Sequence, residues 1–226
     1  MEDSEFHPSV GSSNHPSMRE QRPTGIRGYD KVASRLLATR LPFDVVHRHI
    51  LHLLPANPSR ILDVGAGPGH DAATLARRGH AVIAVEPTLE LREGARELYA
   101  ELPIEWLDDC LPRLEYLSLR RPSPFDFILL EGVWAHLNEN ERREAFAVLA
   151  GLLARGGVLA LSLRHGPAAP GRVTYPVSAT ETIALAEASE LSTLVQIETG
   201  SIQASNIASG VTWTRMAFGA AVAPLR

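Results

Sequence analysis

The fold of this chain is decided by residues 60–69, which read RILDVGAGPG. Residues 60–64 are a short, mostly apolar run typical of a buried strand, and residues 65–69 place a glycine at every second position. Glycine tolerates positive φ angles and lets a ligand approach the backbone closely. A helix that ends near Gly79 is expected to follow, and the amides at its start would face whatever binds. The stretch therefore predicts a strand, a ligand-binding loop and a helix.

Strands and helices alternate through the rest of the chain. The apolar run at residues 81–85 is typical of a strand buried on both faces. We expect helices at 88–102, 138–154 and 178–191. The second of these would begin with a capping box at Asn138 and Glu141 and stop at Gly156-Gly157. Strands are expected at 104–107, 125–130, 158–163, 192–198 and 211–218. This pattern predicts an α/β fold, with a mostly parallel sheet covered by helices on both faces and two final strands without an intervening helix.

The chain divides into a tail and one domain. Residues 1–24 are rich in Ser, Pro, Gly and charge and are predicted to be a disordered tail, with Met18 as a second possible start of translation. Residues 25–226 are predicted to form a single domain. Its residues 25–56 would be an N-terminal helical cap broken by Pro42, and residues 57–226 the core.

Composition excludes several classes of partner. The 226 residues carry 22 Lys+Arg against 26 Asp+Glu, so the chain lacks the basic excess of a nucleic-acid-binding protein. No apolar run approaches the roughly 18 residues of a membrane span, and residues 1–17 lack the apolar core of a signal peptide. Cys110 is the single cysteine, so neither a disulfide within the chain nor a Cys/His zinc site is expected. A cytoplasmic protein is expected, and the composition leaves its oligomeric state open.

Two acidic residues favour a nucleoside ligand other than NAD. Glu86 follows the second strand, where an acid reaches ribose hydroxyls in dinucleotide folds. The NAD fingerprint needs its third glycine at position 70, which is His70 here. Asp63, just before the glycine loop, would also repel a pyrophosphate and would suit a cationic or amine-bearing ligand.

The pattern Asp63-x-Gly65-x-Gly67-x-Gly69, the acid in Val85-Glu86-Pro87 and the final strand pair resemble the class I S-adenosylmethionine-dependent methyltransferases. The resemblance covers about residues 29–226. It implies a Rossmann-like seven-stranded sheet of order 3-2-1-4-5-7-6 with strand 7 antiparallel. It also implies S-adenosylmethionine as cofactor and S-adenosylhomocysteine as product.

The same resemblance implies which residues hold the cofactor. Glu86 would bind the ribose hydroxyls, and Asp109, with Asp108 as its rival, would meet the adenine amine. The glycine loop and Asp63 would hold the methionine moiety. Glu131 stands where many relatives carry a small polar residue, and it would contact either a cationic acceptor or the cofactor amine. The implied set is Asp63, Gly65, Ala66, Gly67, Gly69, Glu86, Pro87, Asp109, Cys110 and Glu131.

A narrower resemblance points to small acceptors. Tyr29-Asp30 and residues 133–137 and 163–167 are similar to small single-domain bacterial methyltransferases of the tellurite-resistance and quinone-methylating types. Those relatives act on small molecules. About 200 residues barely cover the core, so no separate substrate domain is expected within them.

Three residues are candidates for catalysis. An acceptor hydroxyl or ammonium needs a base, and His136 follows the fourth strand where the ligand crevice opens. A structural histidine near a helix start is the alternative for His136. His165 follows the fifth strand at the same edge of the sheet, and Tyr29 either closes over the cofactor or packs the N-terminal helix.

Two further residues are candidates for binding the acceptor. Arg164 would grip a substrate carboxylate with its two-pronged guanidinium, or it is a surface charge. Trp134 would form an apolar wall, or it packs in the core. Trp213 is expected in the core, and Arg142 is expected on a solvated helix face. The loop at 166–175 is expected to be either a substrate lid or an inert connection.

The sequence therefore favours S-adenosylmethionine-dependent methyl transfer to an O, N or S atom of a small-molecule acceptor. A non-catalytic scaffold or sensor of the same fold that binds S-adenosylmethionine is the first alternative. An NAD-dependent oxidoreductase is the second.

Overall fold

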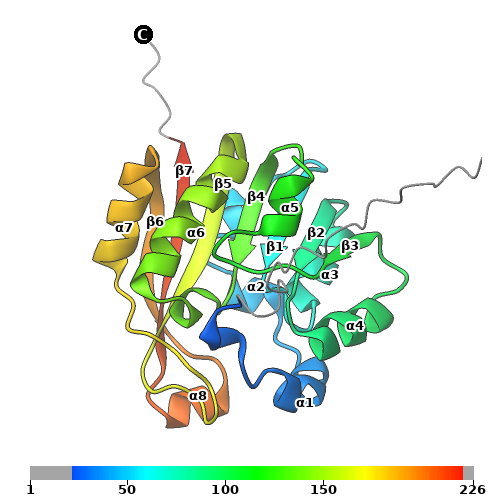
Figure 1. Cartoon of the computed structure of the whole chain (residues 1–226), viewed down its shortest axis with the longest axis vertical. Helices are drawn as coiled ribbons and strands as arrows, with labels where there is room; N and C mark the ends of the chain where they lie inside the picture. The colour runs from blue at the N-terminus through cyan, green and yellow to red at the C-terminus, as the bar shows by residue number, and fades with distance from the viewer. Residues whose placement is uncertain (1–21, 221–226) are drawn as a thin grey trace, which may run out of the picture.

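A seven-stranded sheet runs through the centre of the molecule in the order β3-β2-β1-β4-β5-β7-β6, as a computed structural model describing residues 22–220 shows (Figure 1). Strands β1 to β5 pair in parallel, and β7 is antiparallel to both β5 and β6. The strands are β1 (Arg60–Val64), β2 (Ala81–Val85), β3 (Ile104–Leu107), β4 (Phe125–Leu130), β5 (Leu153–His165), β6 (Leu191–Gly200) and β7 (Thr212–Ala220). The predicted fold class and strand order are confirmed.

Helices cover both faces of this sheet (Figure 1). The helices of the core are α3 (His70–Arg77), α4 (Leu89–Leu98), α5 (Glu115–Leu119), α6 (Glu139–Leu152), α7 (Ala179–Ala188) and α8 (Ala204–Ala208). On the face of α5, α6 and α7, the ring of Phe146 packs edge-on against Trp134 and Phe218. On the opposite face, Leu75 of α3 and Phe43 pack in a second core cluster. The sheet is therefore buried on both sides, as parallel strands require.

The N-terminal segment is less helical than the predicted helical cap at residues 25–56. It consists of short pieces: η1 (Thr24–Ile26), η2 (Asp30–Val32), α1 (Ala33–Ala38), α2 (Phe43–Val46) and η3 (Leu51–Leu53). Pro42 separates α1 from α2, as expected, and forms the N-cap of α2. The segment crosses the lower edge of the sheet in Figure 1, where the parallel strands end. Most of the predicted tail lies outside the described residues.

The helix at 138–154 begins as predicted but ends differently. Asn138 and Glu141 form the capping box, each side chain accepting the other's backbone N–H at 3.0 and 2.7 Å. The helix ends at Leu152, so the predicted stop at Gly156-Gly157 is wrong. The two glycines lie inside β5, where the pairing with β4 is irregular. A Cβ on Gly157 would lie 2.8 Å from the carbonyl oxygen of Phe125, which explains the glycine there.

Arg142 is buried, contrary to the prediction of a solvated position. Its guanidinium donates to both carboxylate oxygens of Glu181 at 2.7 and 3.0 Å and to the carbonyl of Leu137 at 2.5 Å. This ion pair connects α6 to α7. The five-residue helices α5 and α8 were not predicted, because a single turn shows too little periodicity to be recognised in a sequence.

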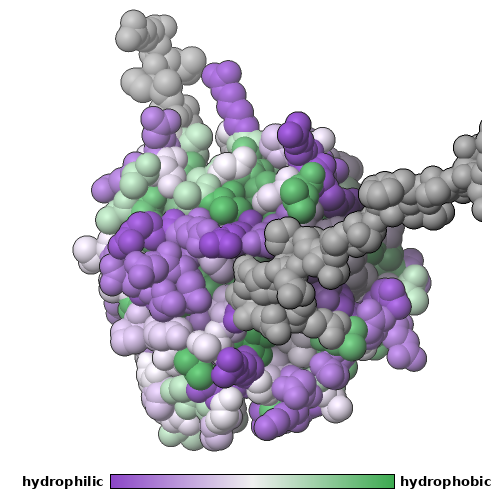
Figure 2. Space-filling view, in the orientation of Figure 1, coloured by the Kyte–Doolittle hydropathy of each residue, from purple (hydrophilic) through white to green (hydrophobic). Residues whose placement is uncertain are grey.

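Hydrophilic side chains cover most of the surface seen in Figure 2, and hydrophobic ones are scattered among them. Within residues 22–220, no helix has both the length and the hydrophobicity that crossing a bilayer requires.

Gly69 provides a test of this packing. Its φ angle is 76°, and an added Cβ would lie 2.4 Å from Cη2 of Trp106 and 3.1 Å from Cβ of Ala95. We expect Gly69→Ala to lower the free energy of unfolding by about 2–4 kcal/mol, measured by urea denaturation, because strain and overpacking add.

Gly151→Ala is the matched control. Gly151 lies in α6 with nothing within 4 Å of an added Cβ, so alanine should stabilise the helix by about 0.5–1 kcal/mol. Equal effects of the two substitutions would contradict the packing described for Gly69.

Candidate functional site

A cavity of about 450 Å³ opens where the parallel strands end. Its walls come from the glycine loop after β1, the ends of β2, β4 and β5, the start of β7, the N-terminal segment, and the residues around α8. This volume lies toward the lower end of the range of about 300–1,000 Å³ typical of small-molecule sites. Elements far apart in the sequence thus line one site, and the predicted glycine loop forms part of its wall.

The glycine loop needs its glycines for two different reasons. Gly65 and Gly67 have φ angles of 70° and 54° and line the cavity together with Ala66. A Cβ on Gly65 would lie 2.5 Å from Cγ2 of Val133, so a side chain there would collide with the opposite wall. Gly69 does not line the cavity and instead lets α3 pack against Trp106. The structure therefore assigns Gly69 to packing.

Glu86 is held rigidly in the cavity wall. Its side chain is buried, and its two carboxylate oxygens accept backbone N–H groups of Gly67 at 2.9 Å and Thr88 at 2.7 Å. Burial raises the pKa of Glu86, while these hydrogen bonds and Arg92 oppose the rise. The carboxylate therefore joins the glycine loop to the end of β2. Its neighbour Pro87 also lines the cavity.

Asp109, and not Asp108, lines the cavity. The carboxylate oxygens of Asp109 each accept a backbone N–H at 2.8 Å, one from Cys110 and one from Leu117. Asp108 instead forms ion pairs with Arg92, at 3.2 Å, and with Arg22. The position of Asp109 favours it over its rival.

Cys110 also lines the cavity but is no nucleophile at neutral pH. Burial raises the pKa of its thiol to about 12, so the thiol stays protonated. The backbone of Cys110, whose N–H is bound to Asp109, is held in place.

Asp63 carries an unusual carboxyl group. It is 2% exposed, lines the cavity, and its Oδ2 has no hydrogen-bond partner among residues 22–220. Burial, followed by the negative charge of Asp71, raises the pKa of Asp63 well above its ordinary value. Buried polar atoms normally have partners, so an unpartnered oxygen at a cavity wall indicates a site for a hydrogen-bond donor.

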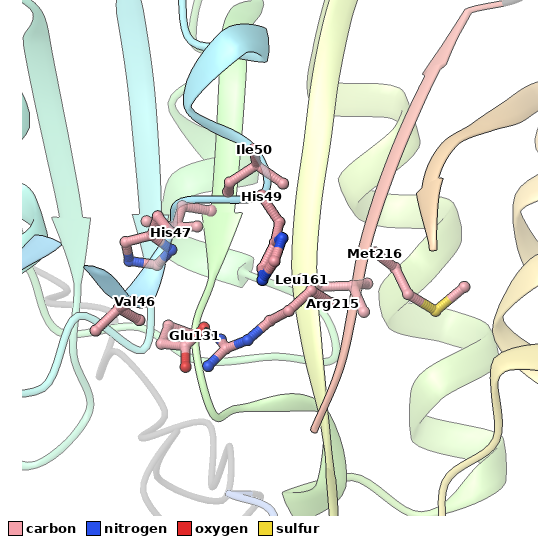
Figure 3. Close-up of a pocket in the computed structure, with 9 residues that line it drawn as sticks. Val46, His47, His49, Ile50, Glu131, Leu161, Arg215 and Met216 are labelled. Carbon is pink, nitrogen blue, oxygen red and sulfur yellow. Dashed lines mark hydrogen bonds and ion pairs between the residues drawn. The ribbon is translucent and has the colours of Figure 1, made fainter. Parts of the chain in front are cut away.

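Two other acids near Asp63 have basic partners. Asp71 is bound by His47 at 2.8 Å; burial lowers the pKa of His47, but Asp71 and Glu131 outweigh it and raise the pKa overall. Glu131 pairs with Arg215 of β7, and Figure 3 shows their side chains meeting in a crevice beside the cavity, near His47 and His49. Glu131 thus lines the cavity as predicted, already neutralised by a partner that the sequence did not reveal.

Tyr29 and His136 form a hydrogen-bonded pair in the cavity wall. The Tyr29 hydroxyl lies 2.8 Å from Nε2 of His136, and Nδ1 of His136 lies 2.8 Å from the carbonyl oxygen of Val173. A carbonyl only accepts, so these partners assign the proton to Nδ1, and Nε2 accepts from Tyr29. Burial, together with Arg172 and Arg164, lowers the pKa of His136. His136 is therefore neutral at pH 7, with a basic nitrogen facing Tyr29.

Two arginines lie beside this pair. Arg164, at the end of β5, lines the cavity and donates to the carbonyl of Pro167 at 2.8 Å. Arg172 lines it too, with its guanidinium carbon 3.2 Å from the centre of the Tyr29 ring. The loop between β5 and α7 thus contributes to the cavity, and the backbone N–H of Tyr175 anchors it to Ala135 at 2.7 Å.

Two predicted residues lie outside the cavity lining. Trp134 is fully buried against Phe146, in agreement with the alternative of core packing. His165 binds the Thr214 hydroxyl at 2.8 Å. Successive residues of a strand face opposite sides, so Arg164 reaches the cavity and His165 does not. The structure does not support a site role for either Trp134 or His165.

Several lining residues were missed. Trp213 was expected in the core but lines the cavity, as do Arg215, Gln203 and Asn206. Trp213 pairs with Arg164 in the register of β5 and β7, and this cross-strand neighbour brings it to the site. The signal that could have found it was the antiparallel pairing itself, since the start of β7 must lie opposite the end of β5.

Comparisons with known proteins agree with this geometry. Residues 61–157, which run from β1 into β5, match the methyltransferase domain family. The chain is 32% identical over 121 residues to an uncharacterized methyltransferase of Mycobacterium tuberculosis, covering 50% of this chain and 58% of that protein. It is 30% identical over 114 residues to one of Bacillus thuringiensis, covering 50% and 47%. The chain thus spans about half the length of these curated relatives.

Solved structures share the fold at low sequence identity. TehB from Haemophilus influenzae aligns at a TM-score of 0.62 and 15% identity, covering 85% of this chain and 66% of that one. A TehB-like SAM-dependent methyltransferase from Corynebacterium glutamicum aligns at 0.60 and 21%, covering 86% and 97%. N-methyltransferase NodS from Bradyrhizobium japonicum, solved with S-adenosylhomocysteine, aligns at 0.60 and 17%, covering 85% and 98%.

The strand order is that of the Rossmann-like fold that these solved methyltransferase structures share, and residues 61–157 match the methyltransferase domain family.

Asp63 gives a prediction about stability. Its folded-state pKa lies above the unfolded value, so ionisation favours the unfolded chain and stability falls as the pH rises. Asp63→Asn removes this charge and should raise the free energy of unfolding at pH 7 by about 1–3 kcal/mol. Urea denaturation at pH 7 and at pH 4 measures this, and the gain should shrink at pH 4.

Asp30→Asn is the control, because Asp30 is exposed at the start of η2. Its effect should stay within about 0.5 kcal/mol at both pH values. A lower free energy of unfolding in Asp63→Asn would contradict this prediction, because it would mean that contacts of the buried carboxylate offset its loss of hydration.

Proposed function

We propose that this protein transfers a methyl group from S-adenosylmethionine to a small-molecule acceptor. One observation carries the proposal: the glycine loop, Glu86, Asp109 and the unpartnered oxygen of Asp63 line a single cavity at the carboxyl edge of the sheet. A nucleoside with a charged amino-acid tail needs hydrogen-bond acceptors for an amine, a ribose and a base along one wall. This cavity offers acceptors of that kind.

The residues present fit S-adenosylmethionine. Gly65 and Gly67 leave the loop backbone open to a ligand, and the Oδ2 atom of Asp63 lacks a donor that an ammonium group would supply. Glu86 uses one lone pair on each oxygen for a backbone amide, so further lone pairs remain for the ribose hydroxyls. Asp109 would meet the adenine amine in the same way, next to the backbone of Cys110.

Bound S-adenosylmethionine supplies a methyl group on a positively charged sulfur, which becomes the neutral thioether of S-adenosylhomocysteine. The protein would align the acceptor and exclude water. An acceptor O–H, N–H or S–H must lose its proton. We assign that proton to Nε2 of His136, relayed through the Tyr29 hydroxyl, which donates to His136 as it accepts from the acceptor.

The Tyr29–His136 pair favours an enzyme over a scaffold that only binds the cofactor. Binding needs the glycine loop and the acids, whereas a neutral histidine with its tautomer set by the Val173 carbonyl serves proton transfer. Formation of S-adenosylhomocysteine over a panel of small acceptors tests the function. Tight cofactor binding with zero turnover would support the scaffold, and stabilisation by NAD(H) alone would support an oxidoreductase.

Glu86 tests the cofactor site. Replacing it with alanine removes the acceptor for the Gly67 and Thr88 amides and, in our proposal, for the ribose. We expect the affinity for S-adenosylhomocysteine to fall about 5- to 150-fold, equivalent to about 1–3 kcal/mol, by titration calorimetry. The exposed Glu187→Ala on α7 should leave the affinity unchanged. Unchanged affinity in Glu86→Ala would rule out the ribose assignment.

His136 tests the proton transfer. Since a base must be unprotonated and the pKa of His136 lies below 6.5, kcat should rise with pH through a value below 6.5 and then level off. His136→Gln should lower kcat about 100- to 10,000-fold and abolish this pH dependence. Tyr29→Phe should lower kcat with the affinity for S-adenosylhomocysteine retained. An unaltered pH profile in His136→Gln would show that His136 only supports the structure.

A further inference from the structure

The charges in the cavity are unevenly compensated. On the cofactor side, Asp71 is bound by His47 and Glu131 by Arg215, while backbone N–H groups bind the carboxylates of Glu86 and Asp109. On the side of Tyr29 and His136, the charges are positive and lack such partners. Within residues 22–220, neither Arg164 nor Arg172 forms an ion pair: Arg164 donates to the carbonyls of Gly166 and Pro167, and Arg172 stacks on the Tyr29 ring. Partly buried cations without carboxylates indicate a site for an anion.

Both guanidinium groups lie where an acceptor would lose its proton. Arg172 stacks on Tyr29, the residue whose hydroxyl binds His136. Both arginines oppose protonation of His136, which places their charges close to its ring. Arg164 lies near the end of β5 and pairs with Trp213 of β7, so the sheet fixes the position of its backbone at the cavity. The anion site and the proton acceptor therefore share one wall.

Trp213 adds a flat, apolar surface to the same wall. It pairs with Arg164 across β5 and β7, and both side chains line the cavity. Gln203 and Asn206 also line the cavity, and the Asn206 amide donates to the Gln203 side-chain carbonyl at 2.8 Å. An aromatic plane beside two guanidinium groups suits a ring that carries a carboxylate.

The volume restricts the size of the acceptor. The whole cavity measures about 450 Å³ and, in our proposed function, holds the cofactor as well. An acceptor that shares this space with the cofactor is expected to be small.

We propose that the acceptor is a small aromatic carboxylate with an ionisable hydroxyl, amine or thiol group, whose carboxylate is bound by Arg164 and Arg172 and whose ring lies against Trp213. This inference rests on the proposed methyltransferase function. The two arginines would also stabilise the negative charge that the acceptor gains when it loses its proton.

Matched probes test the carboxylate. We would titrate the three hydroxybenzoates, the three aminobenzoates and thiosalicylate, each beside its primary amide, into the full-length protein saturated with S-adenosylhomocysteine. At least one carboxylate should bind about tenfold or more tightly than its amide and should be methylated when S-adenosylmethionine is supplied. Phenyl phosphate tests a phosphate group as the alternative anion. Tighter binding of phenyl phosphate than of every carboxylate would overturn the proposal.

Variants test the two arginines. Arg164→Gln and Arg172→Gln should each reduce the preference for carboxylate over amide about tenfold, while the affinity for S-adenosylhomocysteine stays within about twofold of the native value. Arg164→Lys should keep part of the preference, since lysine retains the charge but not the fork. The exposed Arg143→Gln on α6 is the control and should change nothing.

The outcomes separate this inference from the proposed function. Failure to bind S-adenosylhomocysteine would overturn both. Normal binding of S-adenosylhomocysteine with no tested carboxylate bound better than its amide would overturn the inference alone. A fall in S-adenosylhomocysteine affinity in both glutamine variants would show that the arginines bind the cofactor's own carboxylate, which also overturns it.

Discussion

The attachment of the glycine loop to the end of β2 is the constraint on which the site depends. The backbone N–H groups of Gly65 and Ala66 both donate to the carbonyl of Val85, at 2.8 and 3.0 Å. Gly67 then donates to the Glu86 carboxylate. These bonds fix the loop in left-handed conformations that only glycine adopts without strain. They set the positions of the loop, of Glu86 and of the start of α3 together.

The other side of the cavity is built by contacts between distant segments. A Cβ on Gly25 would lie 2.3 Å from the carbonyl oxygen of His136, so the N-terminal segment lies directly against η4 (Trp134–His136). The Thr24 hydroxyl is 3.0 Å from that of Tyr175, and Arg172 covers Tyr29. The N-terminal segment and the loop after β5 therefore close the site as one layer (Figure 1). In our proposal the acceptor lies against this layer, and the cofactor lies against the glycine loop and the ends of β2 and β3.

Patterns that are local in sequence predicted most of the fold. The apolar runs of β1, β2 and β4 and the capping box at Asn138 each depend on neighbours within a few residues, and all of them appear in the structure. The helical cap was predicted less well. Its short helices depend on packing against α3 and α4, and no local signal reports that packing. Arg142 was misassigned for the same reason, since its partner Glu181 lies on another helix.

The sequence by itself determined the strand–loop–helix unit, the sheet order through its resemblance, and the placement of Asp63, Glu86 and Asp109 at strand ends. These follow from the spacing of residues along a chain whose parallel strands all end at one edge. Tertiary structure alone decided that His136 binds Tyr29, that Arg215 pairs with Glu131, and that Trp213, rather than Trp134, lines the cavity. The physical reason is that cross-strand register, side-chain burial and ion pairing between distant segments have no local pattern in the sequence. Only the packed molecule brings them together.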